Sequence, residues 1–213
     1  MTIKTITPEQ IGTTQRKIDR IFIHCSADSH TKNDSAAMMD AWHRARGWKG
    51  IGYHLFIRKD GTLEQGRDIR TIPAAQKGNN TGTIAICLHG GGGNPPANDF
   101  TEAQMKKLVA VANELHKRYP NATFHGHREV AAKACPVFDY KSALRLGPKG
   151  EYKPIVAQPA PKPKDPPPPP DIPKPSPEPY EGPEEQASKA SGYIGIVIFG
   201  VAILGTLAFV ILN

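Results

Sequence analysis

Two histidines and a cysteine lie close together near residue 130. His125 and His127 are two residues apart, so on a strand both side chains would point to one face, and Cys135 follows within a loop's reach. A further nitrogen ligand is available from His24, at the end of an apolar segment. Imidazoles and a thiolate suit zinc, and three protein ligands leave a fourth tetrahedral position open for water. Spacing alone leaves two interpretations open: a catalytic metal site, or histidines that only form hydrogen bonds within a sheet.

The elements that must position these residues alternate along the first 150 residues. Short segments rich in β-branched and aromatic residues predict strands at 20–25, 53–58 and 83–88. The turn Lys59-Asp60-Gly61 predicts a hairpin into residues 62–65. Capping residues predict helices at 34–46, 101–119 and from about 139 to 146. The expected fold class is α/β, with a mixed central β-sheet flanked by helices.

Composition divides the chain into unequal parts. Fourteen of the 21 prolines lie between positions 154 and 183, and the last 20 residues before Asn213 carry no charge. Residues 1–150 hold 22 basic against 13 acidic residues, whereas the remainder holds 5 against 7. This distribution excludes a wholly disordered chain and a polytopic membrane protein, and three cysteines are too few for a disulfide-stapled miniprotein. The expected segments are an N-terminal arm (1–19), a folded domain (20–150), a linker (151–191) and an anchor (192–213).

The C-terminal segments are expected to be a spacer and a membrane anchor. The proline-rich linker cannot build a core and favours disordered, extended polyproline II structure. The run Tyr193–Leu212 has the length of about 20 apolar residues that a transmembrane helix needs. The chain begins with no cleavable signal pattern, so the folded domain is expected to be made in the cytoplasm.

Eight short motifs occur in collinear order over residues 20–146. They are Ile21-Phe-Ile-His-Cys-Ser-Ala27, Trp42-His43, Gly47-Trp48, Ile51-Gly-Tyr-His54, Lys59-Asp-Gly-Thr62, Gly66-Arg-Asp68, Lys77-Gly78 and Lys133-Ala-Cys-Pro-Val-Phe-Asp139. Together they resemble the zinc-dependent N-acetylmuramoyl-L-alanine amidases, a family with peptidoglycan-recognition-protein-like members. Within it, the chain closely resembles the T7-type phage lysozymes. The resemblance includes nothing after Pro154.

The resemblance implies a ligand set for zinc. His24, His127 and Cys135 match the family's zinc ligands, and His127 is preferred over His125 because it lies eight residues before the cysteine, as the family's ligand does. Recognition proteins that have lost this cysteine usually only bind peptidoglycan. Cys135 is therefore the residue that favours an enzyme. The other two cysteines, Cys25 and Cys87, are expected to be buried fillers.

Two further residues match catalytic positions of the family. Lys133 is expected to stabilise a tetrahedral oxyanion, and Tyr53 to hydrogen-bond either the attacking water or that oxyanion. The implied reaction is hydrolysis of the amide between N-acetylmuramic acid and L-alanine. The sequence differs from the family pattern at two positions on the substrate side of the site. Ala75 and Arg128 stand where the close relatives carry histidines.

The resemblance and the anchor lead to an expected function. The chain is interpreted as a phage endolysin-like amidase with peptidoglycan as substrate, held through Tyr193–Leu212 in the host inner membrane for host cell lysis. Its folded domain would stay cytoplasmic until the membrane is permeabilised. The alternative is a binding module that inhibits phage RNA polymerase, with or without amidase activity; direct nucleic-acid binding is not expected. A cellular recycling amidase would share the site, but such enzymes seldom end in a proline spacer and an anchor.

Overall fold

A computed structural model of the chain describes residues 3–154. Most of the predicted linker and the whole of the predicted anchor, Tyr193–Leu212, lie outside the described residues. Within residues 3–154, no helix is both long and apolar enough to cross a membrane.

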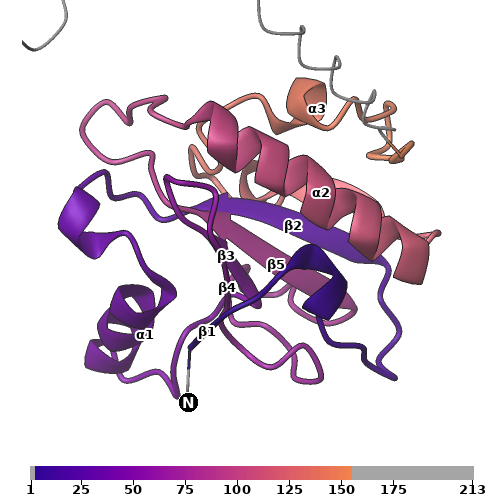
Figure 1. Ribbon diagram of the computed structural model, residues 1–213, viewed down its shortest axis with the longest axis horizontal. Helices are drawn as coiled ribbons and strands as arrows, with labels where there is room; N and C mark the ends of the chain where they lie inside the picture. The colour runs from indigo at the N-terminus through magenta and orange to yellow at the C-terminus, as the bar shows by residue number, and fades with distance from the viewer. Residues whose placement is uncertain (1–2, 155–213) are drawn as a thin grey trace, which may run out of the picture. The chain divides into compact units, whose positions relative to one another are not determined.

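A mixed sheet forms the centre of the described chain (Figure 1). Its strands are β1 (Lys4–Thr5), β2 (Arg20–Cys25), β3 (Leu55–Ile57), β4 (Leu63–Gln65), β5 (Thr83–Leu88) and β6 (Thr123–Gly126). They lie in the order β1-β4-β3-β5-β2-β6. Strands β3, β5, β2 and β6 are parallel to one another, while β4 pairs antiparallel with β3 through the predicted hairpin. The expected mixed α/β fold is thus confirmed.

Helices begin where the capping residues predict. The helices are α1 (Ala36–Ala45), α2 (Glu102–Arg118) and α3 (Tyr140–Ala143), with short 3-10 turns at Pro8–Gln10, Thr31–Asn33 and His127–Glu129. Ser35 caps α1 through its hydroxyl, and Thr101 forms a capping box with Gln104 at the start of α2. The third helix is shorter than predicted, because Arg145 adopts a left-handed conformation with φ of 50° and ends it.

The two faces of the sheet are covered differently. In β2, Ile21 and Ile23 belong to the same apolar cluster as residues of α2, which lies in front of β2 in Figure 1. Because side chains alternate along a strand, Phe22 and His24 point to the other face. There, α1 packs Met39 against Phe56 of β3 and Cys87 of β5. The face that carries His24 is therefore the face covered by the short helix α1.

The N-terminal arm is part of the sheet. Its strand β1 pairs antiparallel with β4, and Arg118 at the end of α2 donates hydrogen bonds to the main-chain oxygens of Ile11, Gly12 and Glu9.

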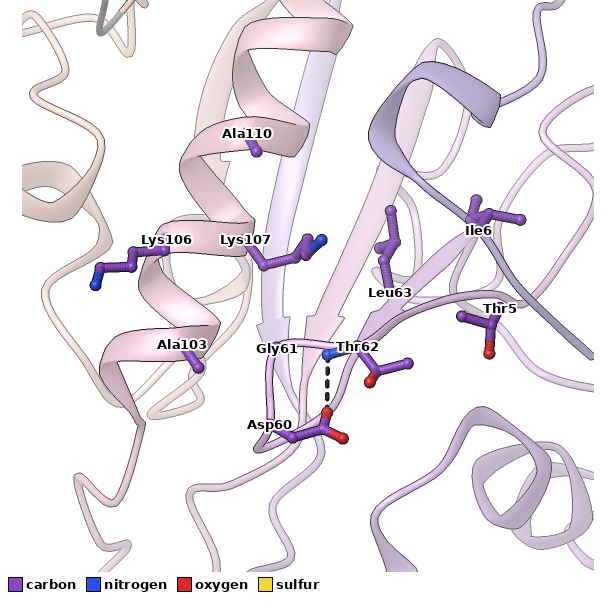
Figure 2. Close-up of a pocket in the computed structure, with 10 residues that line it drawn as sticks. All are labelled: Thr5, Ile6, Asp60, Gly61, Thr62, Leu63, Ala103, Lys106, Lys107 and Ala110. Carbon is purple, nitrogen blue, oxygen red and sulfur yellow. Dashed lines mark hydrogen bonds between the residues drawn. The ribbon is translucent and has the colours of Figure 1, made fainter. Parts of the chain in front are cut away.

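A hollow of 550 Å³ lies between β1, the β3–β4 turn and α2. Figure 2 shows Lys107 directed towards Leu63 in this hollow, with Lys106 directed away. None of the predicted metal ligands lines it.

Strand β3 begins at Leu55, two residues later than predicted, because the side chain of His54 accepts the hydrogen bond that a main-chain carbonyl would otherwise accept from β5. The main-chain N–H of Ala85 donates to Nδ1 of His54 at 3.0 Å, and His54 Nε2 donates to the Thr71 carbonyl at 3.0 Å. A ring that accepts one hydrogen bond at Nδ1 and donates another from Nε2 must be neutral. Burial lowers the pKa of His54 from 6.5 to about 4, which keeps the ring neutral at pH 7.

We expect His54 to make the stability of the fold sensitive to acid. The unfolded chain binds a proton at this residue below about pH 6.5, whereas the folded chain does so only near pH 4. Stability present above pH 6.5 is therefore lost as the pH falls, by up to about 1.4 kcal/mol per pH unit. His54→Leu should lower the free energy of unfolding by about 2 kcal/mol at neutral pH and make this acid dependence shallower.

Urea unfolding of the metal-free wild type and variant at several pH values measures both effects. An acid dependence that is equally steep in the two proteins would contradict the assignment to His54.

Candidate metal centre

Parallel pairing of β2 with β6 brings the two histidines of the predicted site together. Ile23 of β2 is paired with Gly126 of β6, so the next residues, His24 and His127, leave the ends of neighbouring strands side by side. Their ring centroids lie 4.7 Å apart. Carboxyl ends of parallel strands are common places for ligand sites, because the adjoining loops converge there.

The third predicted ligand arrives from the loop that follows. Cys135 Sγ lies 3.9 Å from Nδ1 of His24, and one donor atom from each of His24, His127 and Cys135 falls within 4.8 Å of the others. Bonds of about 2.0–2.3 Å to a tetrahedral zinc ion would separate a nitrogen and a sulfur ligand by roughly 3.5 Å. Two imidazoles and one thiol in this arrangement therefore suit a zinc ion.

His125 does not join this group. Strand β6 ends at Gly126, and His127 opens a 3-10 turn, so the two histidines no longer alternate along one strand. His125 instead contacts the Thr123 hydroxyl at 2.8 Å and the Glu129 carboxylate at 2.6 Å. The expectation that both histidines share one strand face is wrong, because the strand ends between them.

The main chain around Cys135 is held by local contacts. The main-chain N–H of Cys25 donates to Cys135 Sγ at 3.2 Å, and that of Arg128 donates to the Cys135 carbonyl at 2.6 Å. Cys25 is buried, as predicted, but it also lines the cavity beside Cys135. Its thiol contact and burial both raise the pKa of Cys135. A metal ion that binds here must therefore displace a proton from this thiol.

Both histidines are held in the neutral form that a metal requires. His24 is fully buried, and burial lowers its pKa to about 3. The pKa of His127 is lowered by burial and by the charge of Lys133. A neutral imidazole keeps a lone pair on one nitrogen, which a metal ion can use at pH 7.

A cavity of 670 Å³ opens beside these three side chains. Its lining includes His127, Cys135, Tyr53 and Lys133. The Tyr53 ring centroid lies 5.1 Å from that of His24, and within residues 3–154 its hydroxyl has no hydrogen-bond partner. Burial raises the pKa of Tyr53 well above its usual range, so the hydroxyl keeps its proton at neutral pH. Lys133 is exposed at the cavity.

Aromatic side chains form another part of the cavity lining. His43 and Trp48 stack with centroids 4.5 Å apart, and His43 Nδ1 accepts a hydrogen bond from the Gly52 N–H at 3.0 Å.

Of the two residues that replace histidines of the close relatives, Ala75 lines the cavity. Arg128, the other, is not among the lining residues, and its guanidinium donates to the Pro136 carbonyl at 2.7 Å.

One buried neighbour of the candidate metal ligands was not identified from the sequence. Gln76 Oε1 lies 3.1 Å from Nε2 of His24, in the loop before β5. Its neighbours Ala75 and Lys77 occupy positions that belong to the family pattern, but Gln76 does not. No spacing pattern marks Gln76, since only the folding of the loop brings it to the end of β2.

Comparisons with known proteins place the chain among its relatives. Residues 14–138 match the family described as N-acetylmuramoyl-L-alanine amidase. The endolysin of Klebsiella phage KP32 is 42% identical over 132 residues, covering 61% of this chain and 87% of the relative. The endolysin of Escherichia phage T7 is 43% identical over 126 residues, covering 58% and 83%. The solved amidase LysC from Clostridium intestinale is 30% identical, with a TM-score of 0.54 over 61% of this chain and 85% of that one. The chain therefore belongs to the N-acetylmuramoyl-L-alanine amidase family.

Proposed function

We propose that this protein is an endolysin that hydrolyses the amide bond between N-acetylmuramic acid and L-alanine in peptidoglycan. The observation that carries the proposal is the convergence of His24, His127 and Cys135 beside a cavity that also holds Tyr53 and Lys133. Family membership and the similarity to phage endolysins support the same reaction.

The three convergent residues are proposed to hold zinc. Zinc in such a site acts as a Lewis acid towards a carbonyl group and makes water more acidic. The protein supplies neutral imidazoles from His24 and His127 and the thiolate of Cys135, with an open side towards the cavity. Water and the scissile amide can reach the site from that side.

Tyr53 and Lys133 are proposed to stabilise the charge that develops on the amide oxygen. Burial keeps the Tyr53 hydroxyl protonated, so it can donate a hydrogen bond to that oxygen. Lys133 provides a positive charge at the exposed side of the same cavity. A donor and a cation beside the amide oxygen stabilise the charged transition state more than the neutral substrate.

Removal of the thiol should abolish metal binding and activity together. We expect Cys135→Ser to lose its bound zinc and its hydrolysis of purified cell walls, with the fold largely kept. Cys87→Ala is the matched control, because Cys87 is buried in the core under α1 and is not one of the three donors. Zinc content, circular dichroism and wall turbidity measure the three properties. Full wall hydrolysis by Cys135→Ser would contradict the proposal.

Removal of the Tyr53 hydroxyl should separate catalysis from metal binding. We expect Tyr53→Phe to keep its zinc and to lose activity by about 10²–10³-fold in kcat, the usual effect of removing one oxyanion donor. Lys133→Met should lower kcat in the same direction, whereas Lys106→Met, an exposed lysine on α2, should not. The release of new amino termini from cell walls measures kcat. Unchanged kcat in both site variants would remove these residues from the mechanism.

The C-terminal sequence is proposed to anchor the enzyme in the host inner membrane. The support is the uncharged run Tyr193–Leu212, which has the length of a transmembrane helix and follows a proline-rich spacer. We propose that the anchor concentrates enzyme at the membrane until permeabilisation exposes the wall.

None of the described residues favours the alternative function of binding phage RNA polymerase, so the amidase reaction is the one function proposed.

Deletion of residues 193–213 should release the protein from membranes. After cell fractionation, we expect the full chain to sediment with inner membranes and the truncated chain to remain in the supernatant, because a helix of about 20 apolar residues holds a protein in a bilayer. Both should hydrolyse purified walls at similar rates. A full chain that stays in the supernatant would contradict the anchor without affecting the amidase assignment.

A further inference from the structure

Gln76 makes a buried contact with the metal-ligand histidine of β2. Its side chain is fully buried, and its Oε1 lies 3.1 Å from Nε2 of His24. The loop that carries Gln76 is itself fixed, because Asn80 Oδ1 accepts hydrogen bonds from the main-chain N–H groups of both Ala75 and Gln76 at 3.0 Å. Gln76 therefore approaches His24 from a defined position.

The orientation of the Gln76 amide follows from its other partners. The Thr83 hydroxyl uses its only proton to donate to the Asn80 carbonyl at 2.7 Å. That hydroxyl can therefore only accept from Gln76, whose Nε2 lies 2.8 Å away. Gln76 Nε2 also donates to the Asn79 carbonyl at 3.3 Å. A flipped amide would place its oxygen against two acceptors, so Oε1 must face His24.

This orientation selects one tautomer of His24. Gln76 Oε1 carries no proton, so the hydrogen bond between the two side chains needs the proton on Nε2 of His24. A neutral imidazole has one such proton, which leaves the lone pair on Nδ1. Nδ1 is the atom that lies 3.9 Å from Cys135 Sγ, on the side of the metal ligands.

We propose that Gln76 is a positioning residue for the metal centre, which fixes the ring orientation and the tautomer of His24 so that Nδ1 is presented with Cys135 and His127. The proposal rests on the proposed zinc site. Groups that accept a hydrogen bond from the second nitrogen of a ligating histidine raise its basicity and hold its ring, and their loss typically costs 10–100-fold in metal affinity. Gln76 thus connects the loop before β5 to a ligand on β2.

The test compares Gln76→Leu with the wild type in the full chain, purified in detergent. We expect zinc affinity to fall by about 10–100-fold, measured by competition with a chelator of known affinity. In the metal-free protein labelled with 15N-histidine, the wild-type His24 should give the spectrum of an Nε2-protonated ring. Gln76→Leu should give a mixture of tautomers, because leucine accepts no hydrogen bond.

One further variant separates positioning from general loss of structure. Gln104→Leu is the matched control, because Gln104 is an equally buried glutamine that bonds the carbonyls of Ile57 and His89 and has no contact with the site. It should lower thermal stability and leave zinc affinity unchanged.

The outcomes distinguish this inference from the proposed function. If the wild type binds no zinc, the proposed metal site fails, whatever the tautomer of His24. If the wild type binds zinc and Gln76→Leu binds it equally well with the same single tautomer, the positioning role of Gln76 is overturned. If Gln104→Leu loses as much zinc affinity as Gln76→Leu, the effect is one of overall stability and the inference is again overturned.

Discussion

The parallel pairing of β2 with its two neighbours is the constraint on which the site depends. Strand β2 is buried between β5 and β6, and its register with β6 places His24 next to His127 at one edge of the sheet. A strand fixed on both sides cannot shift by one residue without moving its apolar side chains to the wrong face. The apolar core of the sheet therefore also determines where the candidate metal ligands lie.

The two faces of the sheet are covered unequally, which leaves a cavity on one of them. The long helix α2 packs against the face that carries Ile21 and Ile23, where the core is continuous. The short helix α1 covers only a smaller cluster around Phe56 and Cys87 on the other face. The cavity lies on this second side, between residues of α1 and the ends of the strands. Burial lowers the pKa of His24 and keeps its ring neutral, whereas His127 and Cys135 beside it line the cavity.

Polar contacts behind the site complement this apolar framework. His54, His43 and Gln76 each bond a neighbouring loop or strand through a buried side chain. Such contacts hold loops that have no ladder bonds of their own, since a buried polar group without a partner is costly. The arm before β2 is held in a similar way, because the side chain of Arg118 bonds its main-chain oxygens.

The sequence by itself determined the fold class, the helix starts and the three candidate ligands. These follow from local signals: segments rich in β-branched and aromatic residues, capping residues such as Ser35 and Thr101, and motifs in a collinear order that resemble those of a known family. Local signals also located the hairpin after Ile57, since its turn chemistry is contained in three residues. The spacing of His125 and His127 was misleading, because a strand end between them depends on pairing with β2.

Only the tertiary structure decided which side chains surround those ligands. The contacts of Gln76 with His24 and of Cys25 with Cys135 join residues 52 and 110 positions apart, and no local pattern specifies them. The same holds for β1, two residues long, whose place at the sheet edge is set by β4. A local pattern determines what an element is, whereas the packing of distant elements determines what it touches, and the chemistry of this site depends on both.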